Sequence, residues 1–165
     1  MNYSDVTKYF GTKLSDLDFQ AFLKNISCDL TKYNVSKSQY ILSEENGLGV
    51  GFKDEEAVYD ENDQTVFEKG NPVFSAINLS IASCKLLKLM PFDTKFSDTR
   101  TMVRGKAGKP IKIVDYESVL LNKHMMIDHY KIDNLAISID YEAKNETIDF
   151  IQIRDNNQVD TDLKL

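Results

Sequence analysis

The sequence predicts a single α+β domain in which N-terminal helices precede a largely antiparallel, twisted β-sheet, with one further helix near residues 98–107. Apolar residues first recur at helical spacing and later at the two-residue period of strands. Helical segments come first, then strands, then one helix and more strands, an order typical of α+β domains. With 165 residues and 42% hydrophobic content, residues 1–165 can bury a sizeable core as one domain.

The N-terminal segment carries the signals of two helices. A short helix is expected over residues 4–10, closed by Gly11, and a longer one over residues 15–26. Ser15 is the expected N-cap of the longer helix, and Leu14 and Phe19 are the expected hydrophobic staple around it. One apolar stripe at i, i+3, i+4, i+7 spacing consists of Phe19, Phe22, Leu23 and Ile26.

The first strands follow a glycine-rich alternation. Residues 47–52 alternate glycine with Leu48, Val50 and Phe52, which predicts a strand whose second face has no side chains and therefore admits a close neighbour or bends. A hairpin is expected from residues 58–59 to 66–67 around a polar tip at 60–64. A half-buried strand should follow, with Val73, Ile77, Leu79 and Ile81 on one face and Ser75 as the exception.

The second half reads as one helix followed by strands. Asp98 is expected to cap the helix at 98–107, Met102 and Val103 to face inward, and Gly108 with Pro110 to end it. Strands are expected around 125–127, 135–141 and 148–153, with a turn at 142–145. The polar residues 155–165 are expected to form a frayed tail.

Few residues suggest catalysis. His124 and His129 are five residues apart, which on a strand puts them on opposite faces and argues against a shared metal. Asp128 adjoins His129, but adjacent strand residues point apart. Residues 105–110 resemble a phosphate loop yet lack its spacing and its Ser/Thr, so they fit a helix C-terminus better. We therefore expect no catalytic residue, metal or cofactor. A hydrolase using carboxylates such as Asp60 with Asp140 is an alternative that no motif supports.

The compartment is expected to be the cytoplasm, without membrane contact. No secretory leader is recognisable, and no apolar stretch approaches the roughly 20 residues needed to span a bilayer. Cys28 and Cys84 lack metal-type spacing and are expected to be reduced.

Charge is distributed unevenly along the chain, which carries −6 overall. Residues 44–68, here called the acidic stretch, hold nine carboxylates against one lysine, a net charge of −8. Residues 85–112, the basic block, hold eight basic residues against two aspartates, a net charge of +6. The overall acidity argues against direct nucleic-acid binding, and the basic block could pair with the acidic stretch inside the fold.

Three interpretations of the acidic stretch are open. It could be a solvated face, a divalent-metal site, or a docking surface for a basic protein. A calcium loop needs a glycine and a bidentate glutamate at fixed positions, which residues 60–63 lack. On a hairpin tip, acidic side chains can reach into a cationic cleft and raise the on-rate and selectivity of binding.

Short motifs in the second half resemble the pattern of bacterial immunity proteins of contact-dependent inhibition and other polymorphic toxin systems, including the Maf type. A proline–aromatic turn at 91–92 leads to a helix ending at 107–110, followed by 128–130, 137–141 and 148–153 in the places of the family's strands. The opening residues 9–13 and the strand at 47–52 are also similar. The chain departs from the pattern at Ala107, Tyr130 and Phe10, where leucine, tryptophan and leucine are usual. The helix that ends in Gly108-Lys109-Pro110, together with the strands that follow it, also resembles the β-lactamase-inhibitor-protein type of fold.

The resemblance implies a binding function without catalysis. An immunity protein binds a cognate toxin C-terminal domain, here expected to be basic and nuclease-like, and occludes its active site or substrate surface. The alternative is a non-catalytic adaptor or chaperone-like module for a basic protein. We expect a monomer or weak dimer when free. The expected partner-binding residues lie on and beside the predicted hairpin tip: Asp54, Glu55, Glu56, Tyr59, Asp60, Glu61 and Asp63.

Overall fold

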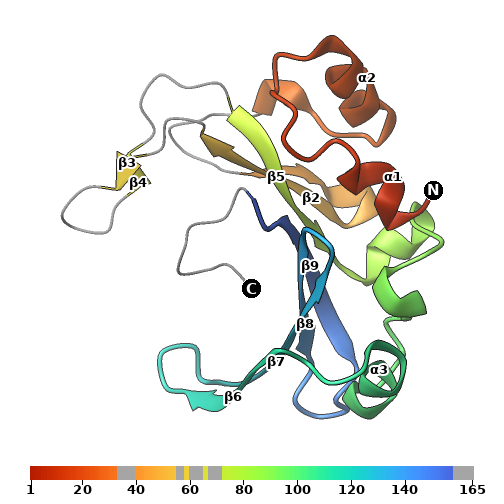
Figure 1. Ribbon diagram of the computed structural model, residues 1–165, viewed down its shortest axis with the longest axis vertical. Helices are drawn as coiled ribbons and strands as arrows, with labels where there is room; N and C mark the ends of the chain where they lie inside the picture. Colours follow the sequence, from red (N-terminus) through yellow and green to blue (C-terminus); the bar gives the residue numbers. More distant parts are fainter. Residues whose placement is uncertain (33–39, 55–57, 60–64, 67–71, 158–165) are drawn as a thin grey trace.

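A computed structural model shows a seven-stranded antiparallel sheet with helices on one side (Figure 1). The structure describes residues 1–32, 40–54, 58–59, 65–66 and 72–157. The predicted α+β class is confirmed. In spatial order the strands are β1 (Tyr40–Ser43), β2 (Leu48–Asp54), β5 (Pro72–Leu79), β9 (Ile148–Asp155), β8 (Leu135–Tyr141), β7 (Lys123–Ile132) and β6 (Lys112–Ser118). A separate two-stranded pair joins β3 (Val58–Tyr59) to β4 (Thr65–Val66).

Three α-helices lie on one side of the sheet: α1 (Tyr3–Thr7), α2 (Leu17–Asn25) and α3 (Arg100–Ala107) (Figure 1). Four 3₁₀ segments complete the described helical structure: η1 (Leu30–Lys32), η2 (Glu44–Asn46), η3 (Ile81–Lys85) and η4 (Pro91–Asp93). The helices bury Val6, Phe19, Leu23 and Val103 completely against the sheet. The core therefore lies between the helices and one sheet face.

The cross-strand register explains how that face becomes continuous core. Directly paired residues run across six strands as Ile41, Val50, Ile77, Ile153, Ile137 and Tyr130. All six are at most 3% exposed. Such aligned apolar rows fix the register, because a slip by one residue would turn every one of these side chains to the other face.

The N-terminal helices begin and end differently from the prediction. α1 ends at Thr7 rather than at residue 10, although Gly11 adopts the expected left-handed conformation at φ +82°. Asp16, not Ser15, is the N-cap of α2, because its carboxylate accepts a hydrogen bond from the Phe19 N–H at 2.8 Å. Burial of Phe19, Leu23 and Ile26 confirms the predicted apolar stripe, and Phe22 packs partly buried against the core.

The helix α3 begins one residue later than predicted, at Arg100. Thr99, not Asp98, is its N-cap, and its hydroxyl accepts from the Met102 N–H at 3.4 Å. Asp98 instead accepts from the Lys95 N–H and pairs with Lys106 at 2.7 Å. Val103 is buried as predicted, but Met102 is 51% exposed, so its inward placement was wrong. Gly108, at φ +82°, closes the helix as expected.

A β-bulge at Ser75 corrects the prediction for β5. Phe74 faces Phe52 and Ala76 faces Gly51, so Ser75 is an extra residue between two regular pairs. The bulge shifts the alternation and brings Phe74 to the same face as Ile77. Both faces of β5 are buried over residues 73–77, so the half-buried description was wrong. The strand ends at Leu79, and the Ile81 side chain is 71% exposed in η3.

The C-terminal strands extend beyond their predicted limits. β7 covers ten residues, and the edge strand β6 was not predicted at all. The alternation of β8 and the turn before β9 are confirmed. Asp155 and Asn156 are buried, and the Asn156 N–H donates to the Asn134 carbonyl at 2.8 Å, so a tail starting at 155 was wrong for these residues. Residues 158–165 lie outside the described residues.

Candidate protein-binding face

The face of the sheet turned away from α1, α2 and α3 carries no helix within the described part of the chain, and we call it the open face (Figure 1). Its side chains come from the alternate positions of each strand. One cross-strand row spans all seven strands as Leu42, Gly49, Asn78, Gln152, Ser138, His129 and Lys112. The row changes from apolar and glycine at the β1 edge to polar and basic at the β6 edge.

The polar half of this row is held by hydrogen bonds. The Gln152 amide donates to Asn78 Oδ1 at 3.0 Å, and His129 Nδ1 lies 2.9 Å from Ser138 Oγ. Burial lowers the pKa of His129 below its usual value, and the positive charges of Arg154 and Lys112 lower it further. The imidazole is therefore neutral at pH 7.

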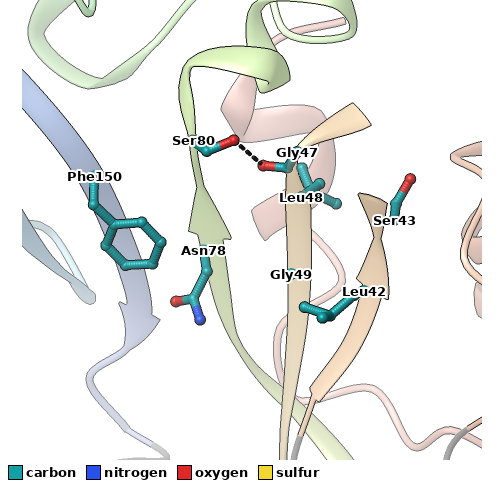
Figure 2. Close-up of a pocket in the computed structure, with 8 residues that line it drawn as sticks. All are labelled: Leu42, Ser43, Gly47, Leu48, Gly49, Asn78, Ser80 and Phe150. Carbon is teal, nitrogen blue, oxygen red and sulfur yellow. Dashed lines mark hydrogen bonds between the residues drawn. The ribbon is translucent and has the colours of Figure 1, made fainter. Parts of the chain in front are cut away.

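The glycine half of the row borders a pocket with a volume of ≈ 230 Å³ (Figure 2). Phe150 of β9 and Asn78 of β5 lie along one side, Leu42 of β1 lies on the other, and the backbone of Gly49 runs between them. The remaining lining residues are Ser43, Gly47, Leu48 and Ser80. The Ser80 hydroxyl donates to the Gly47 carbonyl at 3.2 Å and ties β2 to the end of β5.

Glycine residues make this half of the face shallow and closely packed. A Cβ on Gly49 would stand 3.2 Å from Asn78 Cβ and 3.4 Å from Leu42 Cδ2. Both of these residues also line the pocket, so a side chain at position 49 would crowd it. A Cβ on Gly51 would stand 2.7 Å from Tyr40 Cε1, so the Tyr40 ring occupies the place of a side chain. Of the two predicted possibilities for the glycine face, the close approach is confirmed, whereas the bulge beside Gly51 belongs to β5, where Ser75 is the extra residue.

Two carboxylates neighbour Phe150, one of the residues that line the pocket. Asp140 is the cross-strand partner of Phe150, and Asp149 precedes Phe150 in β9. Burial raises the pKa of Asp140, although Lys123 at 4.0 Å opposes that rise. Asp140 Oδ1 is buried without a hydrogen-bond partner among the described residues. At the other end, Glu45 is exposed in the η2 segment between β1 and β2.

The structure places the predicted partner-binding residues only in part. Asp54 is the last residue of β2, where it pairs with Pro72, and Tyr59 pairs with Thr65 in the predicted hairpin. This pairing confirms a hairpin here, with its second arm at Thr65–Val66; Phe67 of the predicted arm lies outside the described residues. Five of the seven predicted residues lie outside the described residues, so their contacts stay a prediction: Glu55, Glu56, Asp60, Glu61 and Asp63. The same holds for the suggested pairing of Asp60 with Asp140.

The arginines of the basic block pair with carboxylates of the C-terminal strands and not, within the described residues, with the acidic stretch. Asp128 of β7 is completely buried and accepts bidentate hydrogen bonds from Arg104, both at 2.7 Å. Arg100 donates to the same carboxylate at 2.9 Å and to Asp115 of β6 at 2.6 Å. One signal for this cluster was present in the sequence, namely the i, i+4 spacing of Arg100 and Arg104 on α3.

His124 contributes to the charged cluster at the β6 edge. Its Nδ1 lies 2.7 Å from Glu117 and its Nε2 lies 2.8 Å from Asp115. Hydrogen bonds to Glu117 and then to Asp115 raise the pKa of His124. His124 and His129 lie on opposite faces, as predicted. Within the described residues, no group of three or more potential ligands could hold a metal ion.

The two cysteines differ in burial, and neither is paired within the described residues. Cys28 is buried, Cys84 is exposed, and both are free thiols. None of the helices in the described ranges is long and apolar enough to cross a membrane.

Comparison of the chain with protein-family models, with curated proteins and with solved structures gives no match.

Proposed function

We propose that this chain is a bacterial immunity protein. It would bind a cognate toxin domain with a basic, nuclease-like surface and neutralise it by covering the active site or the substrate surface, without catalysis or a cofactor. The observation that supports the proposal best is the open face, where a pocket lies beside β2, a strand that belongs to the acidic stretch.

The size of the pocket favours a protein side chain over a small molecule. Small-molecule sites usually enclose roughly 300–1,000 Å³ and bury most of the ligand. The pocket here measures ≈ 230 Å³, and its walls include Leu42, Phe150 and the Gly49 backbone. An apolar or aromatic anchor residue of a partner suits this space, because such anchors bind in well-packed pockets near the centre of an interface.

The position of the pocket allows a single interface to include the acidic stretch. Gly49 lies beside the pocket, and Asp54 ends the same strand. Five residues of extended strand separate them by about 17 Å. A typical interface buries about 800 Å² on each partner, which is wide enough to cover both places.

Charge complementarity selects the kind of partner. The acidic stretch has a net charge of −8, and Glu45 is exposed near its start. A toxin surface that binds nucleic acid is basic, so it attracts this region at long range and can supply donors at short range. Binding should therefore accelerate at low ionic strength, where charges are less screened.

Co-expression tests the proposal directly. The gene next to the one for this chain is expected to encode a secreted toxin, and its C-terminal domain should stop growth unless this chain is co-expressed. The purified domain should bind the chain. A chain that binds basic proteins but gives no protection would support the adaptor alternative instead.

Charge reversal tests the predicted contacts. Asp60→Lys and Glu61→Lys should each slow association with the toxin domain several-fold at low salt, with a smaller effect at high salt. Asp18→Lys is the matched control, because Asp18 is an exposed aspartate of α2 on the helical side. Association rates measured by surface plasmon resonance at two ionic strengths show whether residues 60 and 61 contribute to binding. Equal rates for all variants would remove residues 60 and 61 from the interface.

A further inference from the structure

The side-chain amide of Asn78 presents a hydrogen-bond donor to the pocket on the open face. The Gln152 amide donates to Asn78 Oδ1 at 3.0 Å, which fixes the orientation of the Asn78 amide and leaves its Nδ2 on the side of β2 (Figure 2). Nδ2 lies 3.7 Å from the position that a Cβ on Gly49 would take, and it donates no hydrogen bond within the described residues. The NH₂ group is therefore a donor held beside the Gly49 backbone.

The other polar side chains that line the pocket already have partners. The Ser80 hydroxyl donates to the Gly47 carbonyl, and Ser43 Oγ accepts from Asn46 Nδ2 at 3.1 Å. Ser43 is also only 2% exposed. Among the lining residues, all of which the structure describes, Asn78 is therefore the side chain that is left to pair with an incoming polar group.

Apolar groups stand around this donor. Phe150 of β9 lies on one side of the Gly49 backbone, and Leu42 of β1, which is 59% exposed, lies on the other (Figure 2). An aromatic ring suits the Phe150 wall, because aromatic pairs gain from offset-stacked or edge-to-face contact. An apolar cavity of roughly 150 Å³ takes up benzene. The ≈ 230 Å³ of this pocket therefore has room for a ring together with a hydroxyl group and a methylene linker.

We infer that the pocket binds a tyrosine side chain of the partner toxin domain. The ring lies against Phe150 and Leu42, and the phenolic oxygen accepts a hydrogen bond from Asn78 Nδ2. The inference rests on the proposed function and names the residue type that this site recognises. Tyrosine combines a large apolar ring with an oxygen that can accept, and it is enriched among the residues that dominate the affinity of interfaces.

Other anchor side chains fit the donor or the walls less well. Tryptophan offers only an N–H, which would meet the NH₂ group of Asn78 donor to donor. Phenylalanine, leucine and methionine would displace water from Asn78 without replacing its hydrogen bond, and a polar group left unpaired in this way weakens binding. Carboxylate and amide side chains could accept the hydrogen bond but would bring polar atoms against Leu42 and Phe150.

Binding of p-cresol, the side-chain analogue of tyrosine, tests the pocket without the toxin domain. Toluene is the matched probe, because it has the same ring and methyl group but no hydroxyl. In NMR titrations of the wild type, p-cresol should shift the signals of Gly49 and of the Asn78 side-chain amide and bind about tenfold more tightly than toluene, the factor of one hydrogen bond. Asn78→Leu should bind both probes equally. Asn25→Leu is the matched control, because Asn25 is an exposed asparagine at the end of α2 on the helical side, and it should keep the tenfold difference.

Affinity for the purified toxin domain encoded beside this chain tests which molecule supplies the tyrosine. Asn78→Leu should raise the dissociation constant about tenfold, mainly through faster dissociation, and Asn25→Leu should leave it unchanged. A double-mutant cycle identifies the anchor. Exchange of one tyrosine of the toxin domain for phenylalanine should cost about tenfold in affinity for the wild type and nothing in affinity for Asn78→Leu.

Each outcome decides between the alternatives. If the wild type does not bind the toxin domain, both the proposed function and this inference fail, and a preference for p-cresol would then assign the pocket to a small phenol. If the wild type binds the toxin domain but binds p-cresol no better than toluene, or if no tyrosine of the domain is coupled to Asn78, only the inference fails. A dimer in sedimentation velocity that Asn78→Leu dissociates would place a tyrosine of a second copy in the pocket and overturn the inference.

Discussion

Replacing Asp128 by asparagine should destabilise the fold strongly. The substitution keeps the size of the side chain and removes the charge that Arg100 and Arg104 share. Asp128 is completely buried, and Arg100 is 7% exposed, so the guanidinium of Arg100 would keep only Asp115 as its ionic partner. Arg104 is more exposed and can turn to solvent. Breaking a buried ion pair by removing one partner costs about 3–5 kcal/mol.

The same loss can be expressed as a melting temperature and as a pH dependence. For a domain of this size each kcal/mol shifts the melting temperature by about 2–4 °C, so the variant should melt about 10 °C lower. Burial alone would raise the pKa of Asp128, but hydrogen bonds from Arg104 and Arg100 lower it below its usual value. A lowered folded-state pKa gives stability that is present at neutral pH and lost in acid. The gap between wild type and variant should therefore be widest near pH 7 and close on acidification.

Urea unfolding followed by circular dichroism at pH 7 and in acid measures both effects. Asp149→Asn is the matched control, because Asp149 forms a surface pair with Lys123 at 3.4 Å and its side chain is 52% exposed. Exposed pairs contribute about 0–1 kcal/mol. The reasoning is refuted if Asp128→Asn costs no more than this control, or if its cost stays constant as the pH falls.

The remaining predictions concern histidines and glycines. In an NMR titration of the two imidazoles, His124 should titrate above the usual pKa and His129 below it, and a shift of both in the same direction would contradict the placement of one of them. His124→Gln should lower stability more at pH 5.5 than at pH 8, because a raised folded-state pKa gives stability that is lost as the pH rises through it. Gly47→Ala should destabilise by at least about 1 kcal/mol, because φ is +57° and the new Cβ would stand 2.6 Å from Ala82 Cβ. Gly105→Ala, in open space on α3, should stabilise by roughly 0.5–1 kcal/mol, so equal effects of the two substitutions in thermal melts would count against this packing.

Periodicity was enough to predict the fold class and most strands, because the apolar rows of the core follow from alternation within each strand. The bulge at Ser75 shows where that reasoning stops. One extra residue exchanges the two faces of the strand for all residues before it. The residue types of β5 indicate the bulge only through the serine that interrupts the apolar positions. The exposed position of Ile81 follows from the same strand ending earlier than the pattern suggests.

The candidate site was less accessible to sequence reasoning. The glycine alternation correctly indicated a face without side chains, but the pocket also needs Phe150, about a hundred residues later in the chain and two strands away in the sheet. The caps of α3 show a similar limit. Asp98 and Thr99 are both good N-caps, and the choice between them depends on Lys106, which engages Asp98 from the last turn of the helix.

The central pairing of β5 with β9 has a consequence for how the molecule assembles. These strands join residues 76–79 to residues 151–154, and β9 also pairs with β8 on its other side. The two halves of the sheet therefore cannot close until β9 has left the ribosome. Contacts so distant in sequence make folding slow and leave strand edges open in the meantime. Under the proposed function, translation of this chain ahead of the toxin would be an advantage, because the binding form arises only after β9 has been made.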